Sequence, residues 1–321
     1  MSRYISAEII DDDADDDNTI ATTATEMSVV SAYSSALLPD GKKKKRVSRK
    51  TAATISLTTP AAAVAAPVPE PKPTLAKWYT EDASVVEMGV DEAGRGPLFG
   101  RVYAAAVVLP KGIATDAFDY TDIKDSKKFH SKKKIADVAE YIKTHAIAWS
   151  VKYADEQTID EINILQATQQ AMHEAIIDIA QRLDVSSSSG AEAGTTTYQL
   201  LIDGNYFVPI LHKHSVTKKL SHMPFVTIEQ GDGKYASIAA ASILAKVARD
   251  AYIQKLCAVY PVLQERYCLH KNMGYAANVH REGIKQHGIT QWHRRTFGIC
   301  KTAALICIPE VAGFEDAADD A

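Results

Sequence analysis

The sequence predicts an α/β fold, and three observations support this prediction. Short apolar runs typical of strands alternate with longer helical patterns between residues 85 and 257. Acidic residues lie at or just beyond the ends of three of the strand-like runs. The chain has 321 residues, of which 46% are hydrophobic, so it is long enough and apolar enough to bury a sizeable core.

The first predicted elements are two strands joined by a tight turn. An apolar run from Val85 to Val90 leads into Asp91 and Glu92, a glycine-rich turn follows, and residues 102–109 form a second β-capable run. The glycines resemble those of a dinucleotide-binding loop, but such a loop opens a helix whose N-terminus holds the pyrophosphate. A strand at residues 102–109 therefore disfavours a dinucleotide-dependent oxidoreductase.

Helices and strands then alternate along the chain. Ser131 is a candidate N-cap for a helix that buries an apolar stripe, and a later helix is rich in Ala and Ser, which allows its backbone to pack close against a sheet. The predicted elements are a helix at 131–145, a strand at 146–153, a helix from about 158 to 183, strands at 198–202 and 225–229, and the Ala/Ser-rich helix at 235–257.

Composition divides the chain into four parts. Residues 1–75 contain an acidic block, a basic block from Lys42 to Lys50 and an Ala/Pro run, so we expect a disordered low-complexity extension. The basic block fits a nucleic-acid tether or a nuclear address, and equally a solvated linker. Residues 76–258 form the predicted catalytic domain, 259–308 a helical region and 309–321 an acidic tail.

Charge and cysteine usage restrict the class of protein. Between residues 76 and 309 there are 27 Lys/Arg and 25 Asp/Glu, a balance that neither requires nor excludes a nucleic-acid partner. The four cysteines show no C-x-x-C spacing, and no secretory signal or membrane-length apolar run occurs. We therefore expect a cytoplasmic protein with reduced thiols.

Four acidic residues are the candidate chemistry. Asp91, Glu92, Asp203 and Asp232 lie at or near strand ends, where α/β folds place reactive groups. Clustered carboxylates repel one another unless a hard divalent cation neutralises them, and two such ions form the usual apparatus of phosphodiester cleavage. A single Asp-Gly pair more often caps a turn, but the recurrence after successive strands favours a metal site. Nucleophile motifs of the G-x-S-x-G or H-E-x-x-H type do not occur.

Strand geometry separates the two adjacent acids. Successive side chains on a regular strand point to opposite faces, so Asp91 and Glu92 cannot both point inward. Either the strand distorts, or Glu92 acts through its main-chain carbonyl, which makes Asp91 the stronger side-chain ligand.

Basic residues offer possible phosphate contacts. Lys132, Lys133 and Lys134 lie in the first turn of a predicted helix, where the helix dipole disfavours cations, so they are either phosphate contacts or solvated surface lysines. Basic and aromatic residues are also interleaved between residues 270 and 297, which suits phosphates and stacked bases, although a helical cap would look similar.

Seven segments together resemble bacterial ribonuclease HII, in the same order along residues 85–300. They are Val90-Asp91-Glu92-Ala93-Gly94-Arg95-Gly96-Pro97, Asp125-Ser126-Lys127-Lys128, Asn163-Ile164-Leu165-Gln166-Ala167-Thr168, Leu201-Ile202-Asp203-Gly204-Asn205, Gly231-Asp232, the stretch from Ser237 to Lys246, and His293-Arg294-Arg295-Thr296-Phe297-Gly298. The Gly-Arg-Gly turn also resembles type HII more than type HIII.

The resemblance implies a ribonuclease H-like mixed sheet flanked by helices, with a C-terminal helical extension. It implies an endoribonuclease that cleaves the RNA strand of RNA/DNA hybrids and acts 5′ of ribonucleotides embedded in duplex DNA, as in ribonucleotide excision repair. The implied cofactors are two Mn2+ or Mg2+ ions per site when substrate is bound. The expected state is a monomer without an obligate protein subunit.

The resemblance also assigns roles to residues. It implies catalytic carboxylates at Asp91, Glu92, Asp203 and Asp232, with the first three as metal ligands. It implies that Gly94, Arg95 and Gly96 contact the ribose 2′-hydroxyl, that Lys127 and Lys128 contact phosphates, and that Tyr275 senses the RNA–DNA junction. Before Tyr275 this chain has Lys271-Asn272-Met273-Gly274, where the family usually has His-Lys-Gly.

Overall fold

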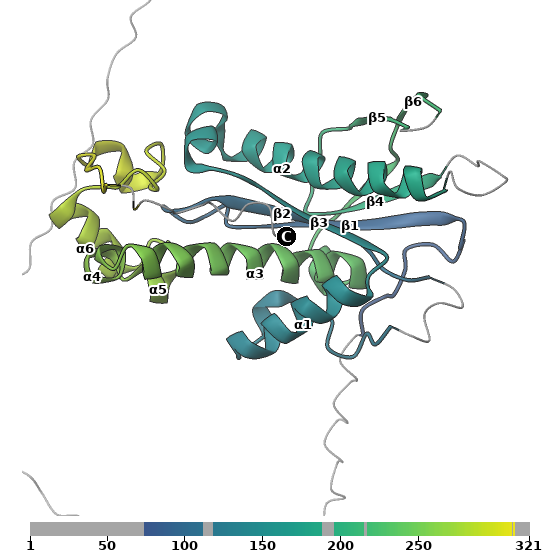
Figure 1. Ribbon diagram of the computed structural model, residues 1–321, viewed down its shortest axis with the longest axis horizontal. Coiled ribbons are helices and arrows are strands. Elements are labelled where there is room, and N and C mark those ends of the chain that lie inside the picture. Colours follow the sequence, from purple (N-terminus) through teal and green to yellow (C-terminus); the bar gives the residue numbers. More distant parts are fainter. Residues whose placement is uncertain (1–73, 112–117, 188–195, 215–216, 310, 312–321) are drawn as a thin grey trace, which may run out of the picture. The chain divides into compact units, whose positions relative to one another are not determined.

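A five-stranded mixed sheet lies at the centre of the fold (Figure 1). The computed structural model describes residues 74–111, 118–187, 196–214, 217–309 and 311. The described residues all belong to one unit, Pro69–Ala321. The predicted disordered extension and acidic tail lie almost wholly outside the described residues.

The sheet has the order β3-β2-β1-β4-β7. The central strand β1 pairs antiparallel with β2 and parallel with β4; β3 extends the sheet antiparallel on one side, and β7 extends it parallel on the other. The strands are β1 (Val85–Ala93), β2 (Val102–Val108), β3 (Ala148–Ala154), β4 (Thr197–Asp203) and β7 (Phe225–Ile228). The mixed sheet and the direct passage from the glycine-rich turn into β2 confirm the predicted strand, turn, strand order and exclude a dinucleotide-binding loop there.

Helices cover both faces of the sheet (Figure 1). One face packs against α2 (Glu156–Ser187) through a core that includes Met88 and Ile176. The other face packs against α3 (Ala236–Val259) and α1 (Lys132–His145), whose N-cap Ser131 accepts a hydrogen bond from the Lys134 amide. The small residues of α3 allow the predicted close approach: a Cβ atom added at Gly89 in β1 would overlap the backbone of Ser237.

Two local features differ from the sequence predictions. Helix α2 begins two residues before the predicted start, at Glu156, and is kinked at Asn163, which has φ 67° and ψ 162°. The Asn163 side chain accepts hydrogen bonds from the amides of Leu165 and Gln166, at 3.0 and 3.1 Å, and so restarts the helix. A hairpin of β5 (Leu211–Lys213) and β6 (Leu220–His222) was not predicted, because three-residue strands are too short to show a period.

Short helices follow α3 and form the C-terminal region. They are α4 (Val262–Tyr267), α5 (Leu269–Asn272) and α6 (Asn278–His287), followed by the 3-10 turn η4 (Gly298–Thr302). The 3-10 turns η2 (Ser126–Lys128) and η3 (Gly231–Gly233) precede α3. This agrees with the predicted α/β fold with a C-terminal helical extension. None of the described helices combines the length and apolarity needed to cross a bilayer.

Candidate active site

Sheet topology brings the predicted acidic residues to one edge of the sheet. Strands β1 and β4 run parallel with Val90 opposite Ile202, so the next residues, Asp91 and Asp203, are neighbours at the point where the β1–β4 pairing ends. Strand β7 runs parallel to β4 and leads into η3, where the Gly231 amide donates a 2.6 Å hydrogen bond to Asp203 Oδ1. Asp232 follows directly, so three strand ends contribute carboxylates to one place.

Asp91 is buried, with only 4% of its surface exposed. Burial raises the pKa of its carboxyl well above the usual value, and the negative charges of Glu92 and Asp203 raise it further. The Glu92 amide donates to Asp91 Oδ1 at 2.7 Å, and a hydrogen bond from Ser242 on α3 also acts to lower the pKa. The carboxylate is therefore held in place while its charge lacks full compensation.

Glu92 lies next to Asp91 but is held differently. Its Oε1 atom is 3.1 Å from Nη1 of Arg95 in the glycine-rich turn. Burial raises the pKa of Glu92, the Arg95 cation opposes this, and the charge of Asp203 adds to it. Adjacent strand residues alternate in direction, yet Asp91 and Glu92 both interact electrostatically with Asp203. The Glu92 side chain can therefore contribute to the same acidic cluster.

Lys127 is the cation that reaches this edge from η2. Its Nζ atom is 3.1 Å from Oδ2 of the buried Asp232, while most of the lysine side chain is exposed. Burial acts to lower the pKa of Lys127, but the hydrogen bond with Asp232 and the nearby acids raise it overall. The pKa of Asp203 is raised by burial and by the charge of Asp232, although the Gly231 hydrogen bond opposes the shift.

The donor set fits a hard divalent cation. All four candidate ligands offer carboxylate oxygens, and burial and mutual repulsion leave negative charge that such a cation would neutralise. Within the described part of the chain, no group of three or more His, Cys, Asp or Glu side chains is arranged so that it could hold a metal ion by itself.

The glycine-rich turn beside these acids, Gly94 to Gly100, is clamped by one buried side chain. Arg294 is fully buried, and its guanidinium donates hydrogen bonds of 2.6–3.0 Å to four backbone carbonyls. The four carbonyls belong to Gly94, Arg95, Pro97 and Gly100. Because a guanidinium presents five donors in a rigid plane, one side chain can hold the whole turn in a single conformation.

A second buried arginine underlies the same turn. Arg249 from α3 donates hydrogen bonds to the carbonyls of Phe99 and Met273, at 3.2 and 2.9 Å. Gly94 has φ +98°, and a Cβ atom at this position would collide with the Arg249 side chain. Glycine is therefore required at Gly94 both by backbone conformation and by the close approach of Arg249.

Tyr275 lies against the glycine-rich turn. A Cβ atom at Gly96 would be 3.9 Å from Tyr275 Cε1, and the Arg249 guanidinium is 5.7 Å from the tyrosine ring centroid. The Tyr275 residue is 52% exposed. The altered sequence before it forms a turn in which Gly274 donates its amide to Asn272 Oδ1 at 2.9 Å and accepts from the Leu98 amide at 2.9 Å.

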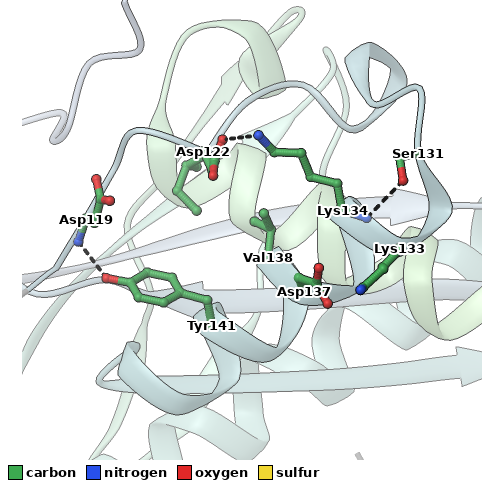
Figure 2. A pocket seen from close by; sticks show the side chains of 9 residues that line it. Asp119, Asp122, Ser131, Lys133, Lys134, Asp137, Val138 and Tyr141 are labelled. Carbon is green, nitrogen blue, oxygen red and sulfur yellow. Dashed lines mark hydrogen bonds and ion pairs between the residues drawn. The ribbon is translucent and has the colours of Figure 1, made fainter.

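The other predicted lysines lie apart from the four acidic residues at the sheet edge. Lys128 Nζ is 3.7 Å from Asp125 Oδ2, within its own turn, whereas Lys127 faces Asp232. Lys133 and Lys134 line a separate pocket of about 520 Å³. Figure 2 shows that this pocket also contains acidic side chains, and that Lys134 is paired with one of them, Asp122, at 2.8 Å. A phosphate contact by these lysines stays a prediction, and Lys128 and Lys134 are paired with carboxylates.

The residues that sequence reasoning missed are the buried positioning groups. Arg294 belongs to the His293–Gly298 segment and to the interleaved basic residues, but neither pattern indicates a buried role for it, and Arg249 was not singled out. A single arginine among the small residues of the Ala/Ser-rich helix was the available sequence signal for Arg249, because a buried charge requires compensating partners. No local pattern indicates the partners of Arg294, which are up to 200 residues away in sequence.

Known proteins match this chain over the same region. The family model of ribonuclease HII matches residues 88–300. Ribonuclease HII of Parabacteroides distasonis is 43% identical over 212 residues, which is 66% of this chain and 89% of that protein. Ribonuclease HII of Bacteroides thetaiotaomicron is 41% identical over 215 residues, 67% of this chain and 90% of that protein.

A solved structure, the PCNA:RNase HII complex from Archaeoglobus fulgidus, is similar at 22% identity and a TM-score of 0.47, covering 66% of this chain and 95% of that chain. The family match spans more than half of the chain and includes every acid at the sheet edge, the Gly-Arg-Gly turn and Tyr275. The chain therefore belongs to the ribonuclease HII family, and with it to the endoribonucleases that act on RNA/DNA hybrids.

Proposed function

We propose that this chain hydrolyses the phosphodiester bond 5′ of a ribonucleotide, both in RNA/DNA hybrids and at single ribonucleotides embedded in duplex DNA. The products would carry a 3′-hydroxyl and a 5′-phosphate. The observation that carries this proposal is the proximity of two features: the carboxylates of Asp91 and Asp203 at the sheet edge and the clamped turn at Gly94–Gly96 directly after β1. A cutting group and a recognition group on one rigid segment would fix the cut relative to the recognised sugar.

The acidic residues would bind the cofactor in this proposal. Asp91 and Asp203 would hold divalent ions, with Glu92 and Asp232 completing the shell and Lys127 contacting a substrate phosphate. Two bound Mn2+ or Mg2+ ions would activate the attacking water and stabilise the leaving oxygen. The raised pKa values of Asp91, Glu92 and Asp203 support this, because they reflect negative charge that lacks full compensation from the protein.

Recognition of the ribose would rest on the glycine-rich turn and Tyr275. The 2′-hydroxyl distinguishes RNA from DNA, and glycine allows backbone groups to approach it closely. The Arg294 hydrogen bonds support this role because they fix the turn before substrate binds. The half-exposed ring of Tyr275 beside Gly96 would pack on the sugar at the junction.

The deciding experiment uses a DNA duplex with one ribonucleotide, labelled at either end of that strand, incubated with and without Mn2+. We expect metal-dependent cleavage at the single phosphate 5′ of the ribonucleotide, and no cleavage of the all-DNA duplex. Cleavage on the 3′ side, or loss of metal dependence, would contradict the proposal. Tight binding without cleavage in either condition would instead identify a non-catalytic hybrid-binding protein.

A further inference from the structure

Two buried histidines connect Tyr275 to the segment that holds the glycine-rich turn. His293 is 1% exposed, and its backbone forms an antiparallel bridge with Phe99, at the end of that turn. His280 in α6 is fully buried, and its Nδ1 atom is 2.8 Å from the carbonyl oxygen of Tyr275. The two rings meet with their Nε2 atoms 3.1 Å apart.

The hydrogen bonds of this pair have only one consistent direction. His293 Nδ1 lies 3.0 Å from the backbone amide of Thr290, which can only donate, and 2.9 Å from the Thr290 hydroxyl, which can donate or accept. The amide makes this nitrogen an acceptor, so the His293 proton resides on Nε2. His293 Nε2 therefore donates to His280 Nε2, which leaves the His280 proton on Nδ1, where it donates to the Tyr275 carbonyl. An amide donor at one end and a carbonyl acceptor at the other thus set both tautomers.

The surroundings keep both rings neutral and in place. Burial lowers the pKa of His280, and burial together with the neighbouring His280 lowers the pKa of His293 well below its usual value. The ring of Phe99 lies edge-on to His293 with centroids 4.9 Å apart, and the ring of Tyr267 lies at 5.0 Å. A proton added to either imidazole would place two N–H groups against each other.

Tyr275 is consequently fixed through its backbone while its ring stays accessible. Its carbonyl also accepts from the Ala277 amide at 2.8 Å, and its own amide donates to the Asn272 carbonyl at 3.0 Å. Tyr275 is 52% exposed, and its ring lies beside Gly96. The histidine pair therefore connects Tyr275 with the glycine-rich turn, the two groups proposed to recognise the ribose, on the side away from solvent.

We propose that His280 and His293 are positioning residues for ribose recognition, and that their directional hydrogen-bond chain holds Tyr275 at a set distance from the glycine-rich turn. This inference rests on the proposed function, in which Tyr275 and the turn contact the sugar together. Neither histidine would touch the substrate; both would act through Tyr275.

The tautomers can be measured independently of activity. Long-range 1H–15N NMR of the full chain with 15N-labelled histidine should show one imidazole protonated only at Nδ1 and one only at Nε2, assigned by loss of each signal in His280→Asn and His293→Gln. The opposite tautomers, rapid exchange between them, or a charged imidazole at neutral pH would overturn the inference even if the enzyme is fully active.

The functional consequence is measured as a ratio, cleavage at a single embedded ribonucleotide over cleavage of a uniform RNA/DNA hybrid. His280→Phe fills the space without hydrogen bonds, and the ratio should fall at least tenfold. In His280→Asn the amide nitrogen replaces Nδ1 as a donor to the Tyr275 carbonyl, and the ratio should stay within threefold of the original protein. Gln286→Phe, at an exposed position of the same helix, is the matched control and should leave the ratio within twofold.

A double variant separates positioning from general damage. If the histidines act through Tyr275, then His280→Phe should not lower the ratio further once Tyr275→Ala is present. Additive losses, or an unchanged ratio in folded His280→Phe, would refute the positioning role. If the unsubstituted chain cleaves neither substrate, the proposed function fails, and the NMR tautomers still decide whether the hydrogen-bond chain exists.

Discussion

At the scale of one residue, Asp91 shows that the negative charges at the sheet edge are unfavourable in the folded protein. The carboxylate is buried beside Glu92 and Asp203, and all three have raised pKa values, first through burial and then, for Asp91, through the adjacent acids. A side chain kept at such a cost to folding is typical of a functional site. Because successive strand residues point to opposite faces, Asp91 was predicted to be the stronger side-chain ligand. Asp91 is the more deeply buried of the two acids, and the Glu92 side chain is paired with Arg95.

Asp91→Asn should therefore abolish metal-dependent cleavage while preserving the fold. We expect the cleavage rate to fall by roughly a thousandfold or more, about 4 kcal/mol of transition-state stabilisation, because a neutral amide is a poor ligand for a hard cation. Binding of an RNA/DNA hybrid should change little. Single-turnover cleavage and a binding titration measure the two effects.

The matched control for that variant is Asp178→Asn, on helix α2 and paired with Arg182. It removes one carboxylate away from the sheet edge and should leave cleavage unchanged. Retained activity in Asp91→Asn would refute the metal-ligand role of Asp91.

Arg294 is the second residue for which a single side chain decides the geometry of the site. Arg294→Lys preserves the charge, but one ammonium cannot reach four carbonyls, so buried acceptors lose their donors. We expect a loss of roughly 2–4 kcal/mol in the free energy of unfolding and weaker cleavage at single ribonucleotides. Urea denaturation measures the first effect.

The neighbouring Arg295→Lys provides the control, because the Arg295 side chain is exposed and only its backbone amide bonds to Asp160. Equal effects of the two substitutions would show that the clamp is not specific to Arg294.

At the scale of elements, close packing between β1 and α3 supports the site. The Ala/Ser-rich pattern predicted such packing, and Gly89, two residues before Asp91, lies directly against the α3 backbone at Ser237. Predicted and observed elements agree where a long period or a cap defines them, as in α1. They differ at α2, because the positive φ of Asn163 divides a helical pattern that looks continuous in sequence.

Gly89→Ala tests whether this contact holds the sheet edge in register. The added methyl group would overlap the Ser237 backbone, and backbone cannot move aside as a flexible side chain could. We expect about 1–3 kcal/mol of destabilisation and reduced cleavage, measured by thermal unfolding and by the single-ribonucleotide assay. Gly233→Ala is the control, since a Cβ atom there meets nothing within 4 Å. A neutral Gly89→Ala would mean that α3 can shift without affecting the acids.

At the scale of the whole molecule, the acidic cluster should link stability to pH and metal. The pKa values of Asp91, Glu92 and Asp203 are raised in the folded state, so these groups favour folding below their unfolded-state values, near 4, and this contribution is lost as pH rises through the folded values. Mn2+ competes with protons for the same oxygens and should restore stability mainly at neutral pH.

The comparison of Asp91→Asn with the unsubstituted chain isolates this effect. In EDTA, the variant's advantage in Tm should increase from pH 5 to pH 8, because the amide stays neutral while Asp91 becomes charged. Added Mn2+ should reduce that advantage at pH 8. Calorimetry of both proteins at the two pH values measures it, and a difference in Tm that does not change with pH would contradict the assigned direction.

The sequence by itself determined the strand, turn, strand order, the acids at the strand ends and the family to which the chain belongs. These features are local: apolar period, a turn composition or a short motif encodes each of them. Only the tertiary structure showed that Arg294 and Arg249 clamp the glycine-rich turn, that His280 and His293 join it to Tyr275, and that Lys127 but not Lys128 pairs with Asp232. Those contacts connect residues up to 200 positions apart, and no periodicity within one segment records which distant backbone group a buried side chain will meet.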